Sequence, residues 1–171
     1  MKYYHVYTEA PHASTFTPLA PGMTFLVGDK LNPYSLRNAN SATRLAPGIS
    51  SSDIISSYIS MLRELVFENV RLSYFPDKPS RKTCLWVTND LNVAKYWMGR
   101  LPHQGKKKIF ELELVDGQVH ETWEDYLTTK MENIAELEVR AESYWRGEQP
   151  ARSQGEREIM LSGIVKIVRE V

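Results

Sequence analysis

The sequence predicts one α+β domain spanning residues 1–171, with a mainly antiparallel sheet and peripheral helices. Strand-like and helix-like segments both occur, and they do not follow one another in regular β–α units. A length of 171 residues suits a single domain. A content of 42% hydrophobic and 25% charged residues is typical of globular chains and excludes wholesale disorder.

The first half predicts two strands and one long helix. Tyr3–Thr8 is rich in Tyr and Val, and Gly22–Gly28 is a short apolar run between glycines, so both are expected to be strands. The clearest helix begins at Ser51-Ser52-Asp53 and ends before Pro76. A buried stripe at helical spacing is expected along it, formed by Ile55, Ile59, Leu62, Leu65, Val66 and Val70.

The middle of the chain predicts a strand, a helix and a hairpin. Thr83–Thr88 reads as a strand, and Asn89-Asp90 caps a helix over Leu91–Leu101. Lys107–Val115 alternates polar and apolar residues, which indicates a strand. Asp116-Gly117 is a favourable two-residue turn and predicts a hairpin into the following residues.

The last third predicts a helix, a loop and a terminal pair of strands. Apolar residues repeat helically from about Trp123 to Tyr144, whereas Trp145–Glu156 is polar and reads as a mobile loop. Glu158–Val171 is apolar and alternating, with a break at Ser162-Gly163 that divides it into two strands.

Charge and composition exclude several classes of protein. Lys and Arg number 21 and Asp and Glu number 21, so strong non-specific attraction to nucleic acid or anionic membranes is not the main activity. A single cysteine, Cys84, allows no internal disulfide and no thiolate zinc site. No apolar run is long enough to cross a membrane and the start lacks a signal-peptide layout, so a cytoplasmic protein is expected.

Most motifs that carry chemistry are absent. The four histidines (His5, His12, His103, His120) lack the spacing of a zinc site, so no metal is expected. Glycine-rich phosphate loops and the Gly-x-Ser-x-Gly elbow are missing. Lys106–Lys108 is a run of three bases, interpreted as a solvated strand entry in preference to a nucleic-acid contact.

Glu156 and Glu158 form one pattern of catalytic interest. Side chains two apart on a strand point the same way, so both carboxylates would face one place, and two close like charges can raise one pKa. Glu111 and Glu113 have the same spacing, so this pattern alone favours an ordinary solvated strand.

The order of features resembles the ADP-ribosyltransferase superfamily, in particular its small bacterial and phage members. His5 lies in an aromatic first strand, and Cys84–Trp97 combines a strand, Thr88 and a helix bearing Ala94 and Tyr96. A Glu-x-Glu pattern follows on a late strand. The resemblance implies a split, mainly antiparallel sheet and NAD as co-substrate.

The resemblance also implies roles for individual residues. His5 would bind ribose hydroxyls of NAD, and the nicotinamide and pyrophosphate would be held by Tyr7, Thr8, Arg81, Trp86, Thr88 and Tyr96. Family members usually have Gly directly after the His and Ser or Thr next, whereas this chain has Val6 and Tyr7. Plain core packing is the alternative for Trp86 and Tyr96.

The acids receive the catalytic roles. Glu158 would stabilise the oxocarbenium-like ribose as nicotinamide leaves, and Glu156 would orient or deprotonate the acceptor. The loop Trp145–Gly155 would contact the target through Arg146, Gln149, Arg152 and Gln154.

These residues together predict an NAD-dependent mono-ADP-ribosyltransferase that modifies a protein or nucleic acid. Such an enzyme would suit a toxin or phage–host conflict effector, with an antitoxin or inhibitor protein as a further partner. Three alternatives remain open: an NAD glycohydrolase, a nucleotide- or protein-binding module without turnover, and an RNA-binding domain.

Overall fold

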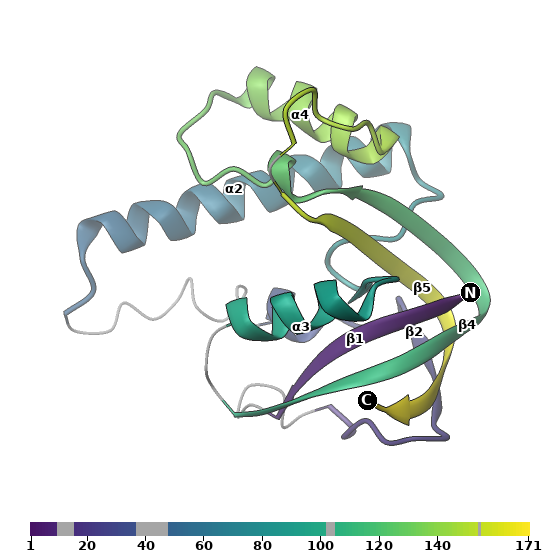
Figure 1. Cartoon of the computed structure of the whole chain (residues 1–171). Helices are drawn as coiled ribbons and strands as arrows, with labels where there is room; N and C mark the ends of the chain where they lie inside the picture. The colour runs from purple at the N-terminus through teal and green to yellow at the C-terminus, as the bar shows by residue number, and fades with distance from the viewer. Residues whose placement is uncertain (10–15, 37–47, 102–104, 154) are drawn as a thin grey trace.

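The computed structural model describes residues 1–9, 16–36, 48–101, 105–153 and 155–171. It is an α+β fold in which the described strands form one five-stranded antiparallel sheet (Figure 1). The sheet order is β1-β4-β5-β2, and β3 also pairs with β5. The predicted α+β class with a mainly antiparallel sheet is therefore confirmed.

Most of the expected strands and helices are present, some of them with different bounds. The strands are β1 (Lys2–Glu9), β2 (Thr24–Val27), β3 (Leu85–Val87), β4 (Lys106–Trp123) and β5 (Arg157–Glu170). The helices whose full bounds are described are α2 (Ser51–Tyr74), α3 (Leu91–Arg100) and α4 (Ile134–Arg146), with a short 3₁₀ turn η2 (Glu124–Tyr126). Residues 33–36 are helical as well.

Strand β5 organises the sheet because different partners pair with its two halves. Its first half pairs with β3 and its second half with β2, while β4 follows it along its length. Strand β1 pairs with β4 and also reaches β3 through one bridge, Tyr4 to Thr88. The strands thus make one connected sheet, whereas the resemblance implied a split one.

The predicted hairpin at Asp116-Gly117 and the predicted break at Ser162-Gly163 are both wrong. Strands β4 and β5 each continue through these positions without interruption, and Gly117 lies opposite Gly163. A Cβ on Gly117 would lie 2.0 Å from the carbonyl oxygen of Ser162, and both glycines have positive φ. The glycines therefore allow two long strands to approach closely at an irregularity, a role that glycine has inside strands.

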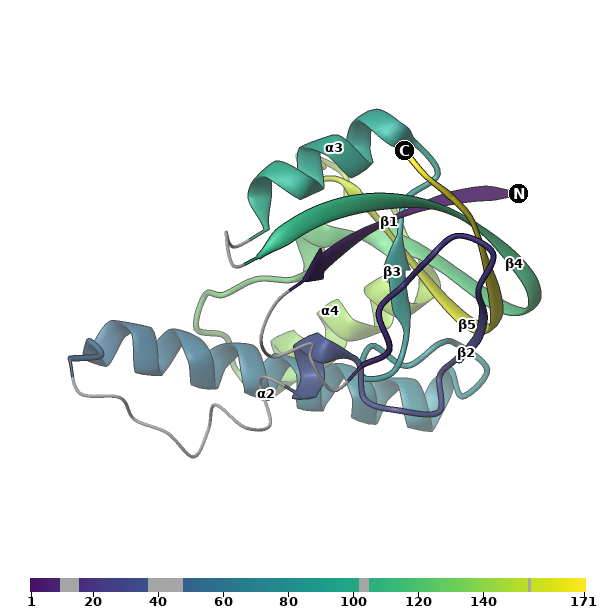
Figure 2. The ribbon, with the colours of Figure 1, turned by 90° about the horizontal axis from the view of Figure 1, so that it is seen from below.

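The sheet has a different core on each face. One face holds Tyr3, Val87, Phe110, Ile159 and Leu161 with other apolar residues. The opposite face packs against α2 and α4, where the two helices lie side by side (Figures 1 and 2). Helix α3 lies elsewhere, against β1 and β4.

The predicted third helix and loop need correction. Trp123 is the last residue of β4, and α4 begins only at Ile134, where Asn133 and Glu136 form a reciprocal capping box. Trp145 belongs to α4 instead of the loop: it is fully buried, and its indole N–H donates to the carbonyl of Phe67. A tryptophan that fills the interface between α2 and α4 cannot belong to a mobile loop.

Helix α2 has the predicted limits, with Ser50 as its N-cap. Its buried face differs from the predicted stripe. Val66 and Val70 are buried as expected, but Leu65 is 52% exposed, and Ile55 and Leu62 are exposed too. The core side of α2 instead includes its four charged residues between Ile54 and Ser73, which are Arg63, Glu64, Glu68 and Arg71. None of the described helices is long and apolar enough to cross a bilayer.

Candidate functional site

Three strands that are distant in sequence, β1, β3 and β5, lie side by side at the predicted site. β3 pairs with β5 so that Trp86 is opposite Met160, which is two residues after Glu158. The Tyr4–Thr88 bridge joins β1 to the end of β3. In addition, a ring nitrogen of His5, Nδ1, lies 2.8 Å from the backbone carbonyl of Trp86.

Glu158 is held in place by two side chains. Its Oε2 accepts a hydrogen bond from Arg81 at 2.7 Å and another from the Tyr144 hydroxyl at 2.6 Å. The Glu158 side chain is 14% exposed. Both bonds go to one oxygen, and the described residues provide no partner for the other oxygen, Oε1. The carboxylate is therefore oriented and mostly enclosed, with one oxygen left for another group.

Arg81 is the centre of this cluster. Its guanidinium bonds Glu64 as well as Glu158, and it lies over the rings of Trp86 and Tyr144. Burial alone would lower its pKa, but the charges of Glu158 and Glu64 more than offset burial and raise its pKa. Arg81 therefore remains a buried, permanent positive charge.

Glu64 balances that charge from α2. Burial would raise its pKa, but Arg81 and then Arg63 outweigh burial and lower the pKa to about 2. Burial raises the pKa of the Tyr144 hydroxyl well above its usual value, so the hydroxyl keeps its proton and donates it to Glu158.

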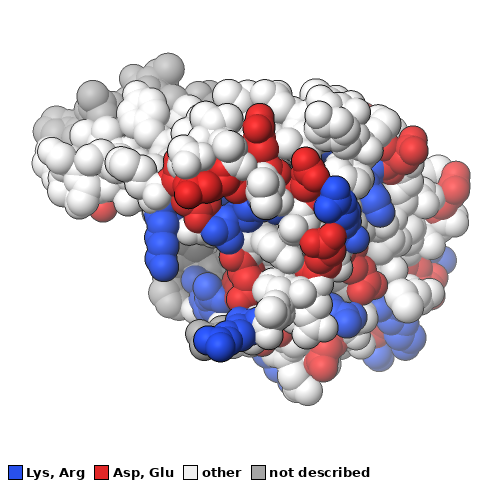
Figure 3. Space-filling model, turned by 90° about the horizontal axis from the view of Figure 1, so that it is seen from above, with Lys and Arg blue, Asp and Glu red and all other residues white. Residues whose placement is uncertain are grey.

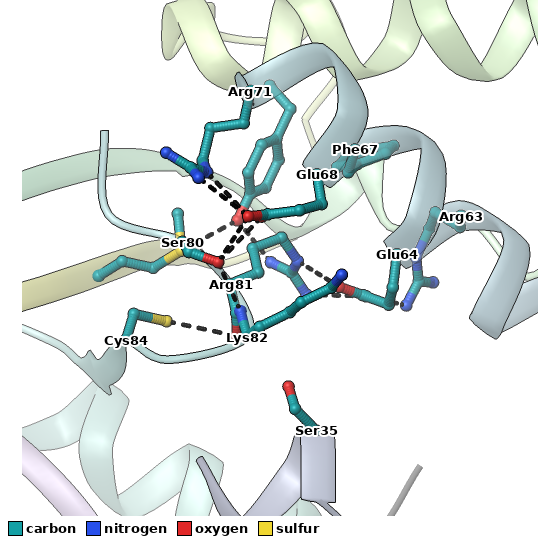
Figure 4. A network of polar contacts seen from close by, with 12 residues as sticks. Ser35, Arg63, Glu64, Phe67, Glu68, Arg71, Ser80, Arg81, Lys82 and Cys84 are labelled. Atoms are coloured by element: carbon teal, nitrogen blue, oxygen red, sulfur yellow. Dashed lines mark hydrogen bonds and ion pairs between the residues drawn. The ribbon is translucent and has the colours of Figure 1, made fainter. Parts of the chain in front are cut away.

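A second ion pair continues the network along α2 (Figure 4). Glu68 bonds Arg71 at 2.9 Å and accepts hydrogen bonds from the Ser80 hydroxyl. Ser80 precedes Arg81, so this contact helps to fix the segment from which the Arg81 side chain extends. Together, three arginines from positions 63, 71 and 81 face three glutamates from positions 64, 68 and 158, and the buried charges are equal in number.

His5 does not face Glu158 directly. Side chains alternate along a strand, and Tyr3 and Tyr7 of β1 pack with the core that contains Ile159. Glu158 shares the opposite face with Met160. Burial lowers the pKa of His5, and its bond to the Trp86 carbonyl offsets this only in part. A neutral His5 donates from Nδ1 to that carbonyl and keeps Nε2 as an acceptor.

The other predicted cofactor contacts are scattered. Tyr7 packs on Phe110 in the core, and Thr8 lies opposite Lys107 on β4. Tyr96 lies on exposed α3 beside Arg100. Only Arg81, Trp86 and Thr88 remain close to Glu158 or to its strand neighbours.

Trp86 has one feature that core packing leaves unexplained. Its indole Nε1 is buried and has no hydrogen-bond partner among the described residues. The ring lies edge-on to Tyr34 and under Arg81. Buried donors are nearly always paired, so this unpaired N–H is an exception that core packing does not account for.

Glu156 and the predicted target loop lie away from the ionic cluster. The backbone of Glu156 is bonded to Glu124, and Asp125 bonds the backbone of Gly155. Arg146 is the last residue of α4, whereas Gln149 and Arg152 are exposed beyond that helix. Gln154 lies outside the described residues. The structure thus places no contact between Glu156 and Glu158.

The remaining candidates have structural roles. The Lys107 ammonium bonds two carbonyls at the end of α3, and Lys108 pairs with Glu9 and Glu170, in line with a strand entry. Burial raises the pKa of Cys84 well above its ordinary value, which disfavours a reactive thiolate. No group of metal-binding side chains occurs in the described part of the chain, and His12 and His103 lie outside it.

A surface depression of about 500 Å³ lies beside the middle of β5. Gly117, Gly163, Gln118 and Ser162 contribute to its walls together with residues of β2. It is formed where the two long strands approach closely, and none of the predicted site residues lines it. We therefore assign no chemistry to it.

Sequence reasoning did not identify Glu64 and Tyr144 as site residues. Glu64 lies on a helix whose apolar spacing suggested that its charges face solvent, and Tyr144 was assigned only to helix packing. A signal did exist, because Arg63, Glu64, Glu68 and Arg71 recur at intervals that place them on one side of α2.

The second buried histidine predicts how stability depends on pH. Burial, the charge of Lys78 and that of Arg81 lower the pKa of His120 from 6.5 to about 4, with the Tyr144 carbonyl bond opposing them. Between pH 6.5 and about 4, His120 therefore binds a proton in the unfolded chain but not in the folded chain. Stability should be complete above pH 6.5 and fall by up to about 3 kcal/mol as the pH approaches 4.

Urea unfolding of wild type and His120→Gln between pH 7 and pH 5 measures this effect. The variant should show a weaker fall in unfolding free energy over this range. A His5→Gln variant measures how much His5 contributes to the pH dependence of stability, because the pKa of His5 is lowered too. Equal pH slopes in wild type and His120→Gln would contradict the assignment.

Comparison with protein-family models places the chain in one family. Residues 23–171 match a family described as a protein of unknown function (DUF2441), and the chain belongs to this family. No curated protein gives a significant match.

Proposed function

We propose that this protein is an NAD-dependent mono-ADP-ribosyltransferase with Glu158 as its catalytic carboxylate. The observation that supports this most is the placement of Glu158. It lies on β5 beside β3, and β3 carries Trp86 and borders the strand of His5. Of the features that suggested the family resemblance, the strands that carry His5, Trp86 and Glu158 are thus neighbours in space.

In the proposed reaction, the bond between the ribose C1′ and the nicotinamide nitrogen breaks. The electron pair leaves with nicotinamide, and positive charge develops on the ribose. Glu158 is suited to stabilise this charge, because Arg81 and Tyr144 already hold its Oε2 and leave Oε1 for a ribose hydroxyl. The acceptor then forms a bond to C1′ and loses its proton.

Two polar groups on the strands that adjoin Glu158 support dinucleotide binding. The unpaired Trp86 indole N–H is a donor for an oxygen of the ligand. Nε2 of neutral His5 is an acceptor for a ribose hydroxyl. The two groups belong to β1 and β3, which the Tyr4–Thr88 bridge joins.

The acceptor side is proposed to include Glu156 and the exposed residues after α4. Glu156 lies two residues before Glu158 and directly precedes β5, which begins at Arg157. Gln149 and Arg152 are exposed, and they lie in the segment between α4 and β5. Their polarity suits a macromolecular target, protein or nucleic acid, that brings its own nucleophile.

A second candidate function, a binding module without turnover, is favoured by one observation. Arg81 and Tyr144 form strong bonds to Glu158, so the carboxylate also serves as a buried structural anion. The presence of Val6 and Tyr7 after His5 points the same way.

Incubation of the protein with a cell lysate and NAD labelled in its adenylate moiety tests the proposal. We expect label on a macromolecule together with free nicotinamide. Free ADP-ribose with no labelled macromolecule would indicate an NAD glycohydrolase instead. Binding of NAD without nicotinamide release would favour the binding module and overturn the proposal.

A further inference from the structure

The face of α2 that points away from the core is apolar. The residues on this face recur at alternating steps of three and four, and we call them the outer seam: Ile55, Tyr58, Leu62, Leu65, Asn69 and Leu72. All six are exposed, and Leu72 is the most exposed of the aliphatic ones at 59%. Residues at this spacing lie in one line along a helix.

After Asp53 in its first turn, the exposed surface of α2 also lacks charge. Between Ile54 and Ser73 the helix has four charged side chains, and all four turn toward the protein interior, where they form the ionic network. The end of the molecule formed by α2, at the left of Figure 3, is almost free of blue and red. Depletion of charge together with large apolar side chains is typical of the centre of an interface, not of a solvated helix face.

The spacing of the outer seam identifies the kind of interface. Steps of three and four define the heptad positions that meet in paired helices. Asn69 occupies one of these positions, and a single Asn in such a seam is the residue type that fixes pairing register. The seam continues for 18 residues, from Ile55 to Leu72, over most of the helix.

We propose that the outer seam of α2 binds the same seam of a second copy of this chain. The order of steps, three-four-three-four-three, reads the same in both directions, so the seam is complementary to itself, as a two-fold interface requires. Its five apolar side chains are about half exposed and offer on the order of 500 Å² per copy. A pair would bury ~1,000 Å², the lower limit for a specific interface.

Sedimentation equilibrium between about 1 and 100 µM protein tests this, since weak associations occupy the low end of the range of interface sizes. Wild type should dimerise. Leu65→Asp places a charge in the middle of the seam and should weaken dimerisation at least ~100-fold. Val139→Asp is the matched control, because Val139 is exposed on α4 outside the seam; this variant should dimerise as wild type does.

A second variant separates loss of the interface from loss of the fold. Asn69→Leu should strengthen association or raise its order, because it removes the polar residue from the seam without disturbing the core. The variants Leu62→Cys and Leu65→Cys each introduce one exposed thiol, and the native Cys84 does not compete with it because Cys84 is buried. An intermolecular disulfide should form either between two copies of Leu62→Cys or in a mixture of Leu62→Cys with Leu65→Cys. A monomeric wild type at 100 µM, or dimerisation that Leu65→Asp leaves unchanged, would overturn the proposal.

Discussion

Replacing Glu158 with glutamine is expected to lower the rate of nicotinamide release from NAD by roughly a hundred- to a thousand-fold. Glutamine keeps the size of the side chain and an oxygen for the Tyr144 hydroxyl, but it removes the negative charge that would stabilise the ribose cation. The rate is measured by chromatography of free nicotinamide at saturating NAD.

The control for this variant is Glu113→Gln, which removes an exposed carboxylate from β4 and should leave the rate unchanged. Because Glu158 also pairs with Arg81, the thermal unfolding of both variants is recorded beside the rate. A Glu158→Gln protein that is folded and releases nicotinamide as fast as wild type would exclude Glu158 as the catalytic group.

Replacing Arg81 with methionine should have the largest effect on stability, a loss of about 3–5 kcal/mol in the free energy of unfolding. Methionine fills a similar volume but leaves Glu64 and Glu158 enclosed without their shared cation. The stacking of the guanidinium on Trp86 and Tyr144 is lost as well. Urea unfolding at pH 7 measures the difference.

Arg146→Met is the matched control because Arg146 is an exposed residue of α4 that pairs with Glu142 at helical spacing. Removal of such a pair should cost less than about 0.5 kcal/mol. Addition of Glu64→Gln to Arg81→Met should recover part of the loss, since one unpaired buried charge disappears. Equal stabilities of Arg81→Met and Arg146→Met would show that the network contributes little.

Local sequence patterns were sufficient for most elements of this fold. Helix α2 begins at Ser51 and ends before Pro76, as Ser51-Ser52-Asp53 and the proline predict, and Asp90 caps α3. Patterns failed where two distant segments decide the outcome. Asp116-Gly117 has the composition of a hairpin turn, yet it pairs with Gly163-Ile164 of β5, and that contact keeps β4 extended.

The candidate site shows the same division. Glu158 was identified because a strand-borne acid fits a known order of motifs, and Arg81 because it precedes β3. Glu64 was not identified, because a charged residue on an amphipathic helix is expected on the wet side. In α2 this expectation fails. Glu64 forms an ion pair with the buried Arg81, whereas the apolar residues Ile55, Leu62 and Leu65 are exposed to solvent. Pairing between buried charges cannot be deduced from the periodicity of one helix.

The most direct test of the account is the time course of free nicotinamide after purified wild-type protein is mixed with NAD and lysate. The account predicts that nicotinamide accumulates in proportion to the amount of protein and that Glu158→Gln nearly abolishes it. If nicotinamide does not appear and calorimetric titration detects no binding of NAD, the assignment of Glu158 to ADP-ribosyl transfer is contradicted.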